Sequence, residues 1–381
     1  MTSSLPKPEP GIVYRERLIA IDAVRGIVIV LMAMDHASHA FNAGRYVTDS
    51  FFMYQQGSVI PVAQFLIRWV THLCAPTFVF LAGFSLALSI AKRETAGESS
   101  TNTDLFLLRR GLVILLLDPI WMSFAFGHGV VFQVLYAIGA SLCCMVLLRR
   151  FPIWSLLVVS LGLLFFSEAL AGLALWIGGG QHVGPIGAFL VTGGRIGQIA
   201  FVLYPLLPWL AYMGFGWSCG RMRLNGTIVN LPRFFLVIGV LSLLVFCLVR
   251  GYNNYGNMLL YRDDNSLLQW LHVSKYPPSL SFASLELGIM SLLLTFFFTW
   301  YGKGSGNDVN PLLVFGQTPL FFYVIHVHLL AGAAWALGMQ RTGGIAESMA
   351  ATIVALLVLY PLCLWYRRIK RLSPNSLLRY L

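Results

Sequence analysis

The chain enters its first apolar segment with the stretch Leu18-Ile-Ala-Ile-Asp22-Ala-Val-Arg25-Gly26-Ile-Val-Ile-Val-Leu-Met-Ala-Met-Asp35-His36-Ala-Ser-His39-Ala-Phe41. This stretch is long enough to cross a bilayer as a helix, for which about 20 residues suffice. Ionisable side chains at membrane depth are costly and persist mainly where they face a bundle interior or an aqueous cavity. The five ionisable residues of this segment therefore mark it as the place to look for function.

Their spacing places most of them on one face. Asp22, Arg25, His36 and His39 follow one another at intervals that keep them on one stripe of a helix, and Asp35 lies one turn before His39. Arg25 and His36 are about 16 Å apart along the axis, at 1.5 Å of rise per residue. The pattern predicts a helix that holds an anion near one membrane face and carries out proton chemistry near the other.

Composition indicates the environment of the whole chain. Of 381 residues, 57% are hydrophobic and 11% are charged, whereas soluble domains are about 25% charged. We expect an all-α, polytopic integral membrane bundle in a single domain, 18–381, after a cytoplasmic tail, 1–17. About ten transmembrane helices are predicted, at 18–41, 61–91, 107–126, 130–148, 152–177, 199–219, 233–250, 282–301, 311–338 and 347–366.

The basic residues predict the orientation of these spans. With the N-terminus inside, 18 Lys and Arg residues fall in cytoplasmic segments and 6 in outer segments. Lys and Arg favour cytoplasmic ends, so we expect both termini to be cytoplasmic and the protein to reside in the inner (plasma) membrane. The net charge of +11 sits in short clusters at helix ends, which indicates membrane anchoring and no nucleic-acid partner.

Several kinds of site are not indicated by the sequence. The six cysteines show neither metal-ligand nor disulfide spacing. There is no P-loop, dinucleotide fingerprint or nucleophile elbow, and we predict no metal site. The oligomeric state stays open, a homodimer included.

The histidines point to a reaction centre on the outer side. Six of the eight fall at or beyond the outer ends of predicted helices, and two lie in the ninth span. Imidazole suits proton transfer near neutral pH. His36 is either a polar residue that is hydrogen-bonded between helices or a functional residue, and the neighbouring Asp35 and His39 favour the functional interpretation. Asp35 could orient an imidazole and stabilise its charged form, and on an ideal helix it faces His39 better than His36. The six outer histidines are His36, His39, His72, His128, His182 and His272, and the other two are His326 and His328.

Other polar residues admit two interpretations. Asp22 and Arg25 form either a structural ion pair or an anchor for phosphate, for which Arg is well suited. Arg68 and His72 lie one turn apart, where Pro76 could bend the helix and aim both into a cavity, although Arg68 could also snorkel to the interface.

Ordered motifs along the chain resemble a known family, that of the heparan-alpha-glucosaminide N-acetyltransferase catalytic domain and its bacterial relatives. The motifs are Leu18-Ile-Ala-Ile-Asp22-Ala-Val-Arg25-Gly26, Leu31-Met-Ala-Met-Asp35-His36, Ala75-Pro-Thr-Phe-Val-Phe-Leu-Ala-Gly83, Tyr204-Pro-Leu-Leu-Pro-Trp209, Lys275-Tyr-Pro-Pro-Ser-Leu280 and Phe315-Gly-Gln-Thr-Pro-Leu-Phe-Phe-Tyr323-Val-Ile-His326.

The resemblance implies an acyltransferase that moves an acetyl group from cytoplasmic acetyl-CoA, which is not permanently bound, to a hydroxyl or amine of a glycan or amino-sugar acceptor on the outer side. In the similar membrane-bound sugar O-acyltransferases, a histidine at the position of His36 is thought to be catalytic. Direct transfer and an acylated His36 both remain open. We expect donor binding by Asp22, Arg25, Lys275 and Tyr276, and acceptor binding by Arg68, His72, Tyr323 and His326.

Two other classes of function compete with this one. A secondary transporter also has broken helices and buried charges, but its coupling groups must be reached from both sides, and here the titratable cluster lies outside. A non-catalytic scaffold leaves the polar stripe of the first helix unexplained.

Overall fold

A computed structural model describes residues 10–126, 129–179, 183–301, 309–373 and 376. Helix α1 (Pro10–Phe41) begins inside the predicted tail, of which residues 1–9 lie outside the described part. His128 and His182 lie outside it as well.

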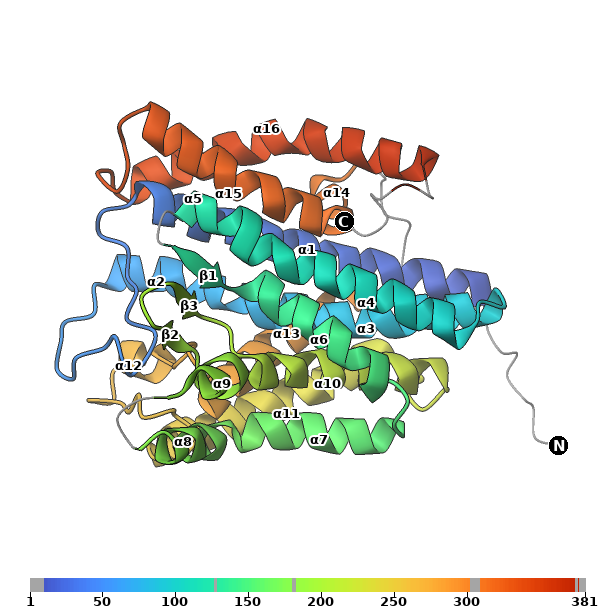
Figure 1. Ribbon diagram of the computed structural model, residues 1–381, viewed down its shortest axis with the longest axis horizontal. Coiled ribbons are helices and arrows are strands. Elements are labelled where there is room, and N and C mark those ends of the chain that lie inside the picture. The colour runs from blue at the N-terminus through green and yellow to red at the C-terminus, as the bar shows by residue number, and fades with distance from the viewer. Residues whose placement is uncertain (1–9, 127–128, 180–182, 302–308, 374–375, 377–381) are drawn as a thin grey trace.

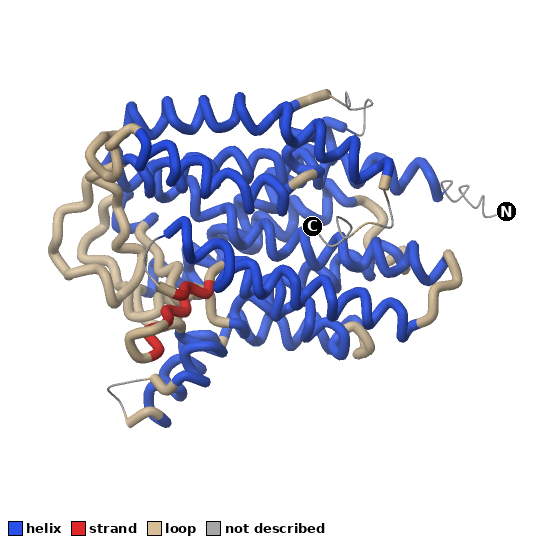
Figure 2. Tube along the Cα trace, turned by 45° about the horizontal axis from the view of Figure 1, so that its top comes forward, coloured by secondary structure: helices blue, strands red, loops and turns tan. Residues whose placement is uncertain are grey.

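Long helices run side by side and form a bundle (Figures 1 and 2), which agrees with the predicted all-α class. Besides α1 they are α3 (Cys74–Thr95), α4 (Ser100–Leu117), α6 (Val134–Leu148), α7 (Ile153–Phe165), α10 (Leu206–Leu224), α11 (Leu231–Tyr252), α13 (Leu280–Tyr301), α15 (Pro319–Ala336) and α16 (Ile345–Leu372). Shorter helices and turns connect them: α2 (Val62–Val70), η1 (Thr71–Leu73), η2 (Asp118–Met122), α5 (Ser123–Phe126), α8 (Ser167–Ile177), α9 (Pro185–Gly187), η3 (Ala188–Thr192), α12 (Leu267–Leu271) and α14 (Pro311–Gln317).

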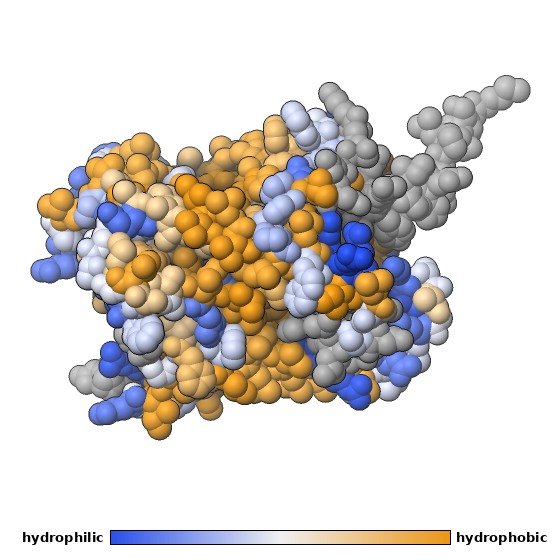
Figure 3. Space-filling view, turned by 90° about the horizontal axis from the view of Figure 1, so that it is seen from above, coloured by the Kyte–Doolittle hydropathy of each residue, from blue (hydrophilic) through white to orange (hydrophobic). Residues whose placement is uncertain are grey.

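Helices overlie all ten predicted ranges, but fewer meet the requirements for a membrane span. Within the described residues, five helices are long and apolar enough to cross a membrane, or six if α7 and α8, which meet at a bend of 65°, form one span. In Figure 3 hydrophobic residues cover the middle of the visible face and hydrophilic residues gather toward its ends. The ten-span topology and the cytoplasmic termini stay predictions.

The two ends of the bundle differ in structure and charge. One end, which we call the loop end, carries the connections 42–61 and 253–279 (left in Figure 1). The opposite end, which we call the basic end, carries the last turns of α3, α10 and α16 with Lys92, Arg93, Arg221, Arg223, Lys370 and Arg371. Helix α1 runs from the basic end to the loop end, so its two groups of ionisable residues lie near opposite ends.

A short sheet at the loop end was not predicted. It has the order β1-β3-β2, in which β1 (Val130–Phe132) runs parallel to β3 (Ala200–Val202) and β2 (Gly194–Ile196) runs antiparallel to it. Strands of three residues give too short an alternation of apolar and polar side chains to be recognised in sequence.

Two glycines allow α1, which carries the polar stripe, to pack with its backbone nearly touching that of α14. A Cβ at Gly26 would collide with the backbone of Leu312 in α14, and one at Gly316 would collide with the Asp22 carbonyl. Small residues permit such close approach between membrane helices. The absence of a side chain at Gly26 therefore lets α14 lie against α1 beside Asp22.

A buried arginine organises the long connection between α11 and α13. Arg250 is fully buried at the end of α11, where a cation must be satisfied by oxygen acceptors. It donates hydrogen bonds to the side chain of Asn257 and to the backbone carbonyls of Leu260, Gln269, Trp270 and His272. This connection is thereby fixed over the loop end of the bundle.

Candidate active site

Two cavities lie along α1, one toward each end of the bundle. The loop-end cavity has a volume of about 1110 Å³ and is lined by Asp35, His36 and His39, among others. The basic-end cavity has a volume of about 420 Å³ and is lined by Asp22 and Arg25, among others. The ionisable residues of the predicted stripe on α1 thus line cavities near both ends of the bundle.

A pair of histidines joins α1 to α15. The His36 Nδ1 atom lies 2.7 Å from His326 Nε2, and His326 Nδ1 lies 2.9 Å from the Phe322 carbonyl oxygen. A carbonyl oxygen only accepts, so His326 Nδ1 donates to it, His326 Nε2 accepts, and His36 Nδ1 donates. The lone pair of His36 is therefore on Nε2, which makes this atom the basic nitrogen of the pair.

The two cavities approach each other beside this pair. Tyr323 lines the basic-end cavity, and its ring centroid lies 5.9 Å from that of His36, which lines the loop-end cavity. At the start of α6, Gln133 lines the loop-end cavity and Val134 lines the basic-end cavity. His36 thus lies close to the wall between the cavities, where a group that extends from one cavity could meet a molecule in the other.

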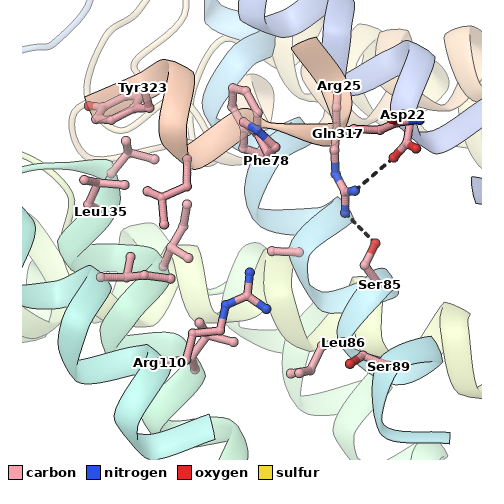
Figure 4. Close-up of a pocket in the computed structure, with 18 of the residues that line it drawn as sticks. Asp22, Arg25, Phe78, Ser85, Leu86, Ser89, Arg110, Leu135, Gln317 and Tyr323 are labelled. Atoms are coloured by element: carbon pink, nitrogen blue, oxygen red, sulfur yellow. Dashed lines mark hydrogen bonds and ion pairs between the residues drawn. The ribbon is translucent and has the colours of Figure 1, made fainter. Parts of the chain in front are cut away.

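The basic-end cavity has more cationic than anionic side chains (Figure 4). Arg25 donates to Asp22, to Ser85 and to the Leu81 carbonyl. Arg110 from α4 and Lys370 from α16 line the same cavity. Among the described residues of this lining, Asp22 is the single acidic one, so there one carboxylate faces three cations.

Arg110 is the least satisfied of these cations. Its Nε atom is buried without a hydrogen-bond partner, and within the described part of the chain no carboxylate lies at ion-pair distance from it. Arg110 is half-buried, and a cation that is partly removed from water without an anion is costly. The arrangement therefore favours a ligand that carries negative charge, and the planar guanidinium suits phosphate.

Sequence reasoning missed Arg110 and Lys370 because it assigned both to basic helix ends. Arg110 lies eleven residues into α4, so its position within a helix was the available signal. Lys370 lies in the last turn of α16, and nothing in the sequence shows that this turn lines the same cavity as α4.

An ionic network forms one wall of the loop-end cavity. Arg68 bonds to Asp35 at 2.8 Å and to Asp49 at 2.7 Å, and Arg45 bonds to Asp35 at 3.0 Å. His72 Nε2 lies 3.0 Å from Asp49. Burial alone would raise the pKa of Asp49, but Arg68 and His72 outweigh it and hold this pKa well below its usual range. The Asp35 carboxylate is thus bound to arginines, which gives it a part in holding α1 against α2.

The remaining predicted residues surround this wall. Tyr276 lines the loop-end cavity, and its hydroxyl accepts from Arg68 at 3.2 Å. Lys275 is buried, with its Nζ atom 5.4 Å from the Tyr276 ring centroid, and both lie at the opposite end from Asp22 and Arg25. His39 lies at the rim, where its Nε2 atom accepts from Arg341 at 3.2 Å.

Comparison with known families assigns the chain. The profile of the family described as "Heparan-alpha-glucosaminide N-acetyltransferase, catalytic" matches residues 17–250. The chain belongs to this family. The comparison with curated proteins found no match.

Membership of the heparan-alpha-glucosaminide N-acetyltransferase catalytic family confirms the resemblance read from the motifs and places the chain among acyltransferases. The matched range contains Asp22, Arg25, His36 and Arg110. Tyr323 and His326 lie beyond it and are tied to the site by their contacts with His36.

Proposed function

We propose that the protein takes an acetyl group from acetyl-CoA at the cytoplasmic face and transfers it to a hydroxyl or amine of a glycan-type acceptor at the outer face. The observation that carries the proposal is the position of His36, which bonds to His326 and lines the loop-end cavity close to Tyr323 of the basic-end cavity. The basic end would face the cytoplasm, because Lys and Arg favour that side of a membrane.

The basic-end cavity suits the donor. Arg110, Lys370 and Arg25 supply positive charge for phosphate groups, while Ser85 and Ser89 supply hydroxyls. Aliphatic side chains, among them Leu135 and Ile138, line the same cavity and suit a long, mostly uncharged arm that ends in a thioester. Tyr323 marks the place where that arm would approach His36.

His36 would act as the general base. Its Nε2 atom accepts the proton of the attacking hydroxyl or amine as the acceptor oxygen or nitrogen bonds to the thioester carbon. The carbon–sulfur bond then breaks, and the proton held on Nε2 passes to the departing thiolate, so atoms and charge balance. His326 holds His36 in the required tautomer through the Nδ1–Nε2 hydrogen bond. General base catalysis of this kind contributes about 10² to 10⁴ in rate.

An acetyl-transfer assay with protein in lipid nanodiscs tests the proposal. It measures the transfer of radiolabelled acetyl groups from acetyl-CoA to an amino-sugar acceptor. We expect product with the unmodified protein, and a loss of about 10²-fold or more in kcat for His36→Ala with CoA binding retained. Full turnover by His36→Ala would remove the histidine from the mechanism. Solute uptake by proteoliposomes without acetyl-CoA would instead favour a transporter.

A further inference from the structure

One wall of the loop-end cavity is apolar and continues onto the outside of the molecule. Leu175 in α8 and Ile199, just before β3, line the cavity. Ile199 is also 79% exposed. Trp176 and Ile177, which follow Leu175 in α8, and Ile186 in α9, which contacts α8, are 76%, 72% and 76% exposed. We call these five residues the apolar lip.

The apolar lip adjoins the surface that would face lipid. Helix α8 turns away from α7 by 65°, and α7 exposes Val158 and Phe165 toward the outside. A pair of apolar helices bent in this way makes a broken span or a re-entrant segment, and the exposed apolar side chains of such a segment contact lipid. Because Leu175 of α8 lines the cavity that contains His36, an apolar path would lead from the bilayer along α8 into this cavity.

A cation stands on the same side of the cavity. Arg195 lies in β2 opposite Phe201 of β3, and it lines the loop-end cavity while remaining exposed. Among the residues that the structure describes, no carboxylate lies at ion-pair distance from Arg195. By contrast, Arg45 and Arg68 of this cavity are bound to Asp35 and Asp49.

We infer that the acceptor is a membrane-anchored amphiphile, namely a saccharide linked through a phosphate to a lipid chain. Its chain lies on the apolar lip, its phosphate binds Arg195, and its hydroxyl or amine reaches His36. This inference rests on the proposed acyl transfer and adds the chemical class of the acceptor. A soluble saccharide would leave the apolar wall of the cavity wet, which is unfavourable.

Four acceptors that share one amino sugar separate the contributions of chain and phosphate. They are glucosamine 1-phosphate, its dodecyl phosphodiester, methyl glucosaminide and dodecyl glucosaminide. With protein in nanodiscs, we expect the dodecyl chain to raise kcat/KM by at least about tenfold, the effect of burying one or two large aliphatic groups. We expect the phosphate to raise it by about 10- to 100-fold, as a charge-assisted hydrogen bond does.

Two variants assign these gains to residues. Ile199→Ser should reduce the gain from the dodecyl chain by at least about threefold, and Arg195→Gln should remove most of the gain from the phosphate. Val354→Ser is the matched control, because Val354 is 58% exposed on α16 and lines neither cavity. Thermal stabilisation by the dodecyl phosphodiester without acetyl-CoA should show the same pattern, which gives a readout independent of transfer.

Equal kcat/KM values for the dodecyl and short acceptors would overturn the lipid-linked assignment. The assignment would also be overturned if Ile199→Ser lowered the gain from the dodecyl chain no more than Val354→Ser does. The apolar lip would then only anchor the protein in the membrane. Failure of the proposed transfer itself has a different signature, because the unmodified protein would then show no thermal shift with acetyl-CoA and no product with any acceptor.

Discussion

His36 and His326 are 290 residues apart in the chain, yet their imidazole rings share a hydrogen bond of 2.7 Å between Nδ1 and Nε2. The rings lie nearly parallel, with centroids 4.9 Å apart. The Phe322 carbonyl fixes the tautomer of the second ring, and the second ring fixes that of the first. This relationship gives the stripe on α1 one basic nitrogen at a defined place.

Removing the orienting ring should lower the rate without removing the base. His326→Phe takes away the acceptor of the His36 proton, so His36 populates the wrong tautomer and kcat falls by between about 10- and 10⁴-fold, the upper value being the cost of losing the orienting carboxylate in a serine protease. Donor KM should change little. Steady-state kinetics measure both quantities. His328→Gln, on the same helix but outside both cavity linings, is the control and should retain activity.

Arg110 should determine the affinity for the donor. Arg110→Gln removes an unpaired cation from the basic-end cavity, so the Kd for CoA should rise by about 10- to 100-fold, and the salt dependence of binding should weaken. Titration calorimetry in nanodiscs measures both. Arg109→Gln changes the adjacent, exposed arginine, so it should leave Kd unchanged. An equal rise in Kd for the two substitutions would contradict this prediction, because it would mean that Arg110 attracts CoA only through the overall positive charge of the basic end.

The contact between α1 and α14 should depend on Gly26. Gly26→Ala places a methyl group against the Leu312 backbone, and overpacking of this kind costs about 1–3 kcal/mol. The melting temperature should fall, and acyl transfer should fall with it because Asp22 and Arg25 shift. Gly162→Ala in α7 meets open space, and its melting temperature should be unchanged or higher. Similar melting curves for both variants would contradict the packing argument.

The connection over the loop end should lose stability as the pH falls. His272 Nε2 donates to the Thr48 carbonyl at 2.7 Å, and burial lowers the pKa of His272. A lowered pKa means that the folded state binds fewer protons than the unfolded state, so the contribution is complete above about pH 6.5 and is lost as pH falls below it. Melting temperatures from pH 8 to 5 should therefore decline less steeply for His272→Gln than for the unmodified protein, and parallel curves would disprove the assignment.

Much of this site could be predicted from sequence where one helix carries it. Helical periodicity predicts that Asp22, Arg25 and His36 share a face of one helix, and in the structure all three line cavities along α1. The bond from His36 to His326 could not be read, because it depends on how α1 and α15 pack. The same holds for Arg110 and Lys370, which come from different helices and line one cavity only in the folded bundle, and for the three-residue strands, one of which holds Arg195.

The central claim is that donor and acceptor enter from opposite ends and meet at His36. Sealed, oriented proteoliposomes test it most directly, with radiolabelled acetyl-CoA outside at the basic end and an amino-sugar acceptor trapped in the lumen at the loop end. We expect labelled product in the lumen, and none with His36→Ala. Product formed only when donor and acceptor are on the same side of the membrane would contradict it.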